Sequence, residues 1–151
     1  MRGQKGYSIV EVMVVLGIIT LLVGLAIPNL FKWGPKQRLL SAASDVQGAI
    51  NLGRMAAIKE SIPVVILFNT PVHGFTVFVD SNASGGKDAG ERVLRTATFA
   101  NDINLNSGFS GNKVSFDSRG LPSASADVTL QNATAGTKTI RLSVTGNSRL
   151  L

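Results

Sequence analysis

The sequence predicts an α+β protein, in which one long N-terminal helix packs by its second half on a small antiparallel β-sheet domain. Three observations lead to this fold class. No formal charge occurs among the 20 residues from Val12 to Phe31. Apolar residues then recur at helical spacing from Leu39 to Ala57. After Pro63 the chain consists of short segments rich in Val, Ile, Thr and Phe, separated by turn residues.

Composition narrows the class of protein further. The chain has 151 residues, a formal net charge of +6 and 44% hydrophobic residues. This length predicts one compact domain, and this hydrophobic content excludes disorder as the main state. The chain has no cysteine, which excludes disulfides and thiolate metal sites. Because His73 is the single histidine, we expect neither a zinc site nor a catalytic triad, and therefore no enzyme.

The apolar run from Val12 to Phe31 is long enough to span a membrane. At about 1.5 Å per residue it covers roughly 30 Å as a helix, which is the thickness of a hydrocarbon core. Arg2 and Lys5 precede it, so we expect the N-terminus on the cytoplasmic side. A secretory signal peptide is the competing interpretation, but no cleavage site of the A-x-A type follows the run.

Glu11 is the one acidic residue at the start of this apolar segment. A carboxylate costs about 2.5 to 3.5 kcal/mol near the centre of a bilayer, so such residues usually have a partner or a function. We therefore expect Glu11 to pair with a cation.

Gly6, the aromatic Tyr7, Glu11 and the apolar run resemble the class III signal of type IV pilins and type II secretion pseudopilins. The resemblance implies that a prepilin peptidase cleaves after Gly6 and methylates the new N-terminus at Tyr7. It also implies that Glu11 is the assembly residue, paired with the terminal amine of a neighbouring subunit. Pro28 stands where many pilins have a helix-kinking proline, and a proline loosens a helix because it lacks an N–H. An ordinary single-pass anchor with a chance glycine and glutamate is the alternative.

Three segments follow from this interpretation. Residues 1–6 are the leader peptide, 7–35 are the hydrophobic transmembrane and filament-core helix, and 36–151 are the globular domain. The helix is expected from about Tyr7 to Lys59, because the residue before Pro63 is biased toward extended geometry. Gly34 and Pro35 mark a point where the helix can bend or break. The apolar face of its second half is Leu39, Ala43, Val46, Ile50, Gly53 and Ala57.

Six strands are expected after the helix. They are Val64–Phe68, Gly74–Asp80, Arg92–Phe99, Val114–Asp117, Asp127–Gln131 and Lys138–Thr145. The order of segments, from 78–80 through 90–95 and 114–120 to 140–146, is similar to the GspH/FimT group of minor pilins and pseudopilins. This resemblance covers essentially the whole chain and implies the pilin fold.

The loop from Asp80 to Glu91 is a candidate calcium site. Its oxygen-bearing residues have the spacing of a calcium loop, with a glycine at position 6. The candidate ligands are Asp80, Asn82, Ser84, Asp88 and Glu91. The alternative is a solvated hairpin that uses the same residue types for turn chemistry.

Basic residues near the C-terminus form a second candidate site. Strand alternation places Ile140 and Leu142 on one face and Arg141 on the other, so Lys138, Arg141 and Arg149 are candidates for holding DNA phosphates. DNA-binding pilins of the FimT type suggest this function by resemblance. A solvated basic surface is the alternative interpretation.

The resemblance implies a structural subunit of a type IV pilus or a type II secretion pseudopilus. The implied partners are other pilin or pseudopilin subunits, the prepilin peptidase, an inner-membrane assembly platform and, before assembly, membrane lipid. The implied location is the inner membrane, with a periplasmic C-terminal domain, and then the filament. No cofactor is expected beyond the possible calcium ion. DNA binding in DNA uptake is the alternative function.

Overall fold

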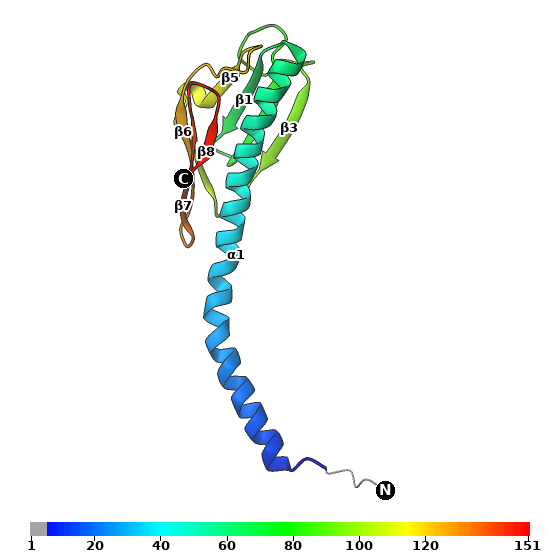
Figure 1. Cartoon of the computed structure of the whole chain (residues 1–151), viewed down its shortest axis with the longest axis vertical. Coiled ribbons are helices and arrows are strands. Elements are labelled where there is room, and N and C mark those ends of the chain that lie inside the picture. Colours follow the sequence, from blue (N-terminus) through cyan, green and yellow to red (C-terminus); the bar gives the residue numbers. More distant parts are fainter. Residues whose placement is uncertain (1–5) are drawn as a thin grey trace. The chain divides into compact units, whose positions relative to one another are not determined.

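The computed structural model describes residues 6–151, with the side chains of residues 25–32 left out of the description. One helix, α1 (Ile9–Glu60), is followed by eight strands and one short 3-10 helix, η1 (Ser110–Asn112). The strands are β1 (Val64–Asn69), β2 (Gly74–Val79), β3 (Val93–Thr98), β4 (Asn104–Ser107), β5 (Lys113–Phe116), β6 (Ala126–Asn132), β7 (Gly136–Leu142) and β8 (Ser148–Leu150). The predicted α+β class is therefore confirmed (Figure 1).

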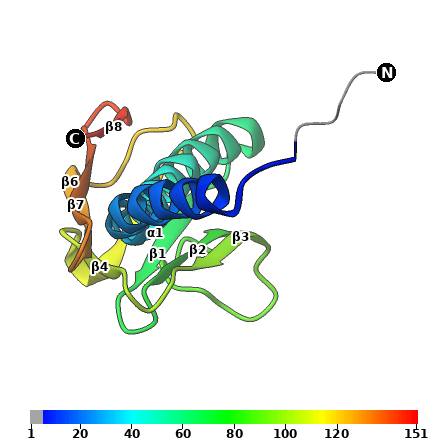
Figure 2. The same cartoon turned by 90° about the horizontal axis from the view of Figure 1, so that it is seen from below.

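The strands form two antiparallel sheets of four strands each. Sheet A has the order β3-β2-β1-β5, and sheet B has the order β4-β6-β7-β8. Figure 2 shows the two sheets on two sides of the second half of α1. Buried apolar side chains from this helix segment and from both sheets form one continuous core. The globular part, Pro35–Leu151, is a compact unit by itself.

The predicted apolar face of α1 is the face that enters this core. Leu39, Ala43, Val46, Ile50 and Ala57 are all buried. At Gly53 the helix comes so close to sheet A that an added Cβ would lie 3.3 Å from Ile66 and 3.5 Å from Phe116. Small residues at this face therefore let the helix backbone approach the sheet closely.

The helix boundaries lie close to the predicted ones. Secondary structure continues through Gly34 and Pro35, so the helix is not interrupted there. It ends at Glu60, one residue after the predicted Lys59. Ser61 then takes a positive φ of 56°, which reverses the chain before Pro63 and the start of β1.

All six predicted strands are present, each within two or three residues of its expected ends. The sequence analysis missed β4 and β8. Only Leu105 is buried among the four residues of β4, and β8 has only three residues, so neither segment carries a clear alternating pattern.

Part of the N-terminal prediction falls outside the described residues. Residues 1–5 of the predicted leader and the side chain of Pro28 are not among them. In the portion of the chain that the structure describes, no helix is both long and apolar enough to cross a membrane. Because the apolar run from Val12 to Phe31 includes side chains outside that portion, the transmembrane segment stays a prediction.

The close contact between β2 and β3 gives a first test of the fold. At Gly74 an added Cβ would lie 2.4 Å from the carbonyl oxygen of Ala97 on the neighbouring strand. We expect Gly74→Ala to lower the free energy of unfolding of the fragment 35–151 by about 1–3 kcal/mol, since the backbone must shift to admit the methyl group. Urea denaturation measures this change.

Gly86→Ala is the matched control. Only the Ser84 hydroxyl lies near its added Cβ, at 3.9 Å, so its effect should stay within about 0.5 kcal/mol. Equal stability of the two variants would contradict the β2–β3 register.

Candidate functional site

The predicted cleavage point lies just before the helix. The N–H of Val12 donates to the carbonyl oxygen of Ser8 at 3.2 Å, which closes the first turn of α1. Gly6 and Tyr7 precede this turn without regular secondary structure, and the Tyr7 side chain is 83% exposed. A peptidase needs backbone that is accessible and not tied into a helix, and these two residues meet that need.

Glu11 lies in the first turn of α1. A negative charge is favourable at this end of a helix, because the first N–H groups have no partners within the helix. Glu11 lines a shallow depression of about 260 Å³ together with Tyr7, Val12, Val15 and Leu16. None of the ion pairs between residues in the described ranges involves Glu11. Its carboxylate is thus exposed within an otherwise apolar surface.

Residues 9–23 of α1 expose apolar side chains on all faces of the helix. The exposed large apolar residues are Ile9, Val10, Val12, Met13, Val14, Val15, Leu16, Ile18, Ile19, Leu21, Leu22 and Val23. A helix that is apolar all round requires burial in a membrane or among other protein elements. We therefore expect this segment to function only when a membrane or other protein elements cover its apolar surface.

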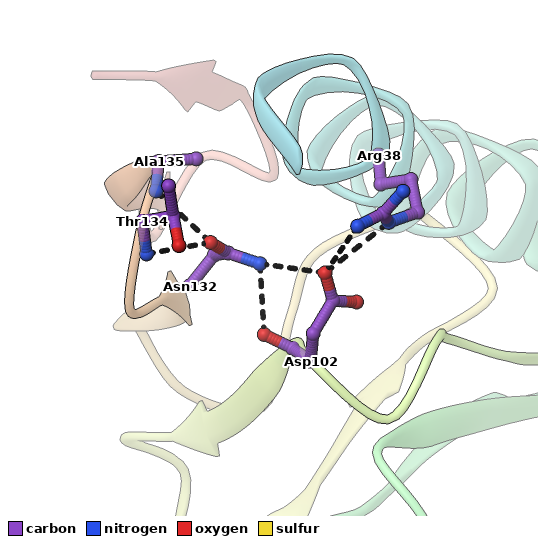
Figure 3. A network of polar contacts seen from close by, with 5 residues as sticks. All are labelled: Arg38, Asp102, Asn132, Thr134 and Ala135. Carbon is purple, nitrogen blue, oxygen red and sulfur yellow. Dashed lines mark hydrogen bonds and ion pairs between the residues drawn. The ribbon is translucent and has the colours of Figure 1, made fainter. Parts of the chain in front are cut away.

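A network of polar contacts joins α1 to sheet B. Figure 3 shows Arg38, which reaches from the helix to the carboxylate of Asp102 in the loop before β4. The Arg38 Nη2 to Asp102 Oδ2 distance is 2.7 Å, and Arg38 Nε lies 3.2 Å from the same oxygen. Asn132, at the end of β6, completes the network on the other side.

The Asn132 side chain is buried, and its amide group is fully used. Its Nδ2 donates to the carbonyl oxygen and to the carboxylate of Asp102, at 2.9 and 3.0 Å. Its Oδ1 accepts from the backbone N–H groups of Thr134 and Ala135, both at 2.9 Å (Figure 3). The amide therefore holds the β6–β7 turn and the loop before β4 in one arrangement. A buried polar group that forms all of its hydrogen bonds favours a single geometry of the groups around it.

The pKa of Asp102 is lowered, chiefly by the hydrogen bond from Arg38. A depressed folded-state pKa means that the ionised carboxylate stabilises the fold at pH values above the unfolded-state pKa of about 3.9. This contribution is lost as the pH falls through the lower folded-state value. Sequence analysis could not find the network, since Arg38 and Asp102 are 64 positions apart.

The loop predicted to bind calcium forms its own hydrogen-bonded structure. The buried carboxylate of Asp80 accepts from the N–H groups of Ser84 and Gly85, at 3.0 and 2.8 Å. Asp88 accepts from the Asn82 amide and the Ser84 hydroxyl, both at 2.8 Å, and these bonds lower its pKa. The predicted residues thus come together, but their oxygens face hydrogen-bond donors.

The far end of the same loop is closed by Glu91, which accepts from the N–H groups of Ser81 and Asp88. Within residues 6–151, as far as they are described, no group of three or more His, Asp or Glu side chains could hold a metal ion. Calcium binding by this loop stays a prediction.

The loop lies over the face of sheet A that is turned away from α1. The Lys113 Nζ donates to the carbonyl oxygen of Gly85 at 2.6 Å, and Lys113, Gly85 and Val65 line one cavity of about 270 Å³. Val65 and Phe78, which are directly paired on this face, are both buried. The loop therefore has a structural role in covering this face.

The structure separates the three predicted DNA-binding cations. Arg141 and Arg149 are directly opposite each other on β7 and β8, and both are exposed. Lys138 falls on the other face of β7, the face that also carries the buried Ile140. Arg141 also pairs with Asp127 on β6, at 2.9 and 2.8 Å, which lowers the pKa of Asp127.

The buried Asn132 amide gives a second test. We expect Asn132→Ala to lower the free energy of unfolding of the fragment 35–151 by about 2–3 kcal/mol, because two N–H groups and one carbonyl group lose their partner. Asn106→Ala, at an exposed site on β4, is the control and should change it by less than about 0.5 kcal/mol. A neutral Asn132→Ala variant in urea denaturation would contradict the network.

Comparisons with known proteins agree with this architecture. Residues 42–147 match the profile of the family described as type II transport protein GspH. Residues 1–27 match that of the prokaryotic N-terminal methylation motif. The chain is 30% identical to the pilin-like protein PilA1 of Thermus thermophilus over 97% of its own length and 98% of the relative's length.

Two kinds of solved structure share the fold. The type IV minor pilin FimU of Pseudomonas aeruginosa matches with a TM-score of 0.60 and 18% identity, over 77% of this chain and 90% of FimU. The minor pseudopilin EpsH from the type II secretion system of Vibrio cholerae matches with a TM-score of 0.61 and 13% identity, over 76% of this chain and 96% of EpsH.

Proposed function

Because the chain belongs to the GspH family of type II transport proteins, we propose that it works as a minor pilin or pseudopilin that is cleaved after Gly6 and inserted into a filament through α1. The observation that carries this proposal is the apolar surface of residues 9–23, exposed on every side, with one carboxylate at its start. The family and the fold are those of structural subunits of type IV pili or type II secretion systems.

Processing by a prepilin peptidase is the first step of the proposed function. It is supported by the N-terminal methylation motif and by the accessible backbone at Gly6 and Tyr7. Cleavage after Gly6 creates a free amine at Tyr7, and that amine is the site of the proposed methylation. The same step brings a positive charge within four residues of Glu11.

Assembly is the second step. Before assembly, the first half of α1 lies in the inner membrane with the globular domain in the periplasm. An assembly platform then transfers it into the filament, where neighbouring helices take the place of lipid around the same apolar side chains. The apolar side chains therefore stay out of water in both states, and the favourable free energy of their burial is retained.

Glu11 sets the register of this packing. A carboxylate buried among apolar helices is strongly destabilising unless it is paired, because its desolvation is not otherwise offset. The amine of Tyr7 on a neighbouring subunit supplies the partner. A subunit that is displaced along the helix axis leaves both charges unpaired, so the pair selects one axial position.

Substitution of Gly6 and of Glu11 tests the two steps separately. We expect Gly6→Leu to leave the chain beginning at Met1. We expect Glu11→Gln to be cleaved normally but to enter filaments at least about tenfold less, since the neutral amide loses its charged partner. Mass spectrometry of membranes and of sheared filaments measures both.

Thr20→Ala is the matched control on the same helix, where the Thr20 hydroxyl donates only to the Leu16 carbonyl oxygen. It should be cleaved and incorporated as the native chain is. Cleavage well beyond the apolar segment, or full incorporation of Glu11→Gln, would contradict the proposal.

A second candidate function is DNA binding by the tail, in a minor pilin that acts in DNA uptake. One observation favours it: Arg141 and Arg149 are directly paired on neighbouring strands, and both are exposed on the same face of sheet B. Asp127 offsets one of these charges. The site is therefore smaller than the three cations predicted from the sequence.

The salt dependence of DNA binding tests this candidate. If the paired arginines hold phosphates, Arg141→Ala with Arg149→Ala lowers DNA affinity and reduces the slope of log K against log salt by about 2, while Lys138→Ala changes neither. Fluorescence anisotropy with a labelled duplex at several salt concentrations gives both quantities. An unchanged slope in the double variant would dismiss the candidate.

A further inference from the structure

The cavity of about 270 Å³ beside β5, here called the Lys113 cavity, is surrounded mainly by hydrogen-bond donors. Val65, which is 1% exposed, supplies part of its apolar wall. Its polar side chains come from three parts of the chain: Ser110 from η1, Lys113 and Ser115 from β5, and Ser123 from the segment that follows β5. None of its lining residues, all of which the structure describes, has an acidic side chain.

The ammonium group of Lys113 is held in place at this cavity. Its Nζ donates to the carbonyl oxygen of Gly85 at 2.6 Å. The side chain also lies close to two glycines, since an added Cβ at Gly85 would be 3.1 Å from Nζ and one at Gly111 would be 3.9 Å from Cγ and Cε. Because the ammonium group is already ordered, little further freedom is lost when a ligand binds to it.

Several donors at the cavity have no partner within the described part of the chain. The hydrogen bond to Gly85 uses one of the three N–H groups of Lys113, which leaves two for a ligand. The Ser123 hydroxyl oxygen accepts from the N–H of Ser115 at 3.2 Å, so its own O–H group remains able to donate. The hydrogen bonds between described residues do not involve the hydroxyls of Ser110 and Ser115. Two N–H groups and three O–H groups are therefore available.

The positive charge of Lys113 has no carboxylate partner in the described ranges, because none of the ion pairs found there includes it. Two acidic residues, Asp80 and Asp117, line an adjoining depression of about 480 Å³. Asp117 is paired with Arg119 at 3.1 Å, and the Asp80 carboxylate accepts from two backbone N–H groups. The Lys113 cavity therefore combines an unneutralised positive charge with an excess of donors, which is the complement of an anion.

We propose that the Lys113 cavity binds a phosphate group, either free or as a monoester. Lysine is a common phosphate ligand, and a phosphate group offers three or more strong acceptor oxygens. The donors come from η1, from β5 and from the segment after β5, an arrangement that suits a tetrahedral group better than a planar carboxylate. The volume is near the lower end of the range for small-molecule sites, about 300–1,000 Å³, so an ester with a small substituent fits.

This inference goes beyond the proposed function and does not depend on it. All residues of the cavity belong to the compact unit Pro35–Leu151, whereas cleavage and filament assembly are assigned to the N-terminal segment. Incorporation that depends on Glu11 therefore tests the proposed function alone, and phosphate binding tests the cavity alone.

A titration followed by nitrogen-15 NMR tests the proposal on the full chain in a non-ionic detergent, which itself carries no phosphate. Sodium phosphate, glycerol phosphate and sodium acetate are added in separate titrations at constant ionic strength. We expect saturable shifts of the amide signals of Gly85, Ser110 and Lys113 with both phosphates. Acetate should bind at least about tenfold more weakly, because it has fewer acceptor oxygens and a smaller charge.

Three variants test which side chains hold the anion. We expect Lys113→Gln to weaken phosphate binding at least about tenfold and Ser110→Ala at least about threefold. Lys87→Gln is the matched control, since it removes the same charge from an exposed site outside the cavity, and it should bind as the native chain does. The Ser110 hydroxyl has no partner to lose within the described residues, so Ser110→Ala decides the matter if the spectrum of Lys113→Gln shows an unfolded chain.

The two phosphate titrations distinguish the source of the group. Equal affinity for phosphate and glycerol phosphate supports the proposal with the free anion as a sufficient ligand, and tighter binding of glycerol phosphate supports it with an ester as the preferred one. Shifts that do not saturate, or acetate binding as tight as phosphate binding, overturn the proposal. An equal loss of affinity in Lys87→Gln and Lys113→Gln also overturns it, because the attraction would then belong to the net charge of the chain.

Discussion

The packing of one apolar face of α1 against two sheets is the interaction on which the globular domain depends. Neither sheet alone covers the buried side chains from Leu39 to Ala57, since the core draws on both. Close approach at Gly53 brings the helix backbone against Ile66 and Phe116. A four-stranded sheet with one buried face needs such a partner, because the apolar face otherwise stays in water.

The two halves of the same helix present different surfaces. Its second half is amphipathic and is buried on one side by the protein's own sheets. Residues 9–23, in its first half, expose apolar side chains on every side of the helix. In the proposed function, a membrane and a bundle of similar helices both provide this cover, so one surface serves before and after assembly, and Glu11 adds the specificity that apolar packing lacks.

Polar side chains in the domain mainly form hydrogen bonds that fix its turns and loops. Asn132 and Asp102 fix the turn after β6 and the loop before β4, and the Asp80 loop is joined to β5 by the hydrogen bond from Lys113 to Gly85. The loop's acidic residues are spaced as in a calcium site, yet the same spacing also suits a loop that binds its own N–H groups. Because this spacing suits both kinds of loop, it does not by itself distinguish a calcium site from a loop that binds its own N–H groups.

The sequence by itself determined what depends on neighbouring residues: the helix and its buried face, six of eight strands, and the Gly6, Tyr7 and Glu11 motif. Local periodicity and a contiguous motif carry that information. Only the tertiary structure decided what depends on distant residues. It separated Lys138 from Arg141, joined Arg38 to Asp102 and placed β3 at an edge of sheet A. Strand order and loop paths decide which distant residues come into contact. Such contacts therefore leave no periodic pattern in the sequence.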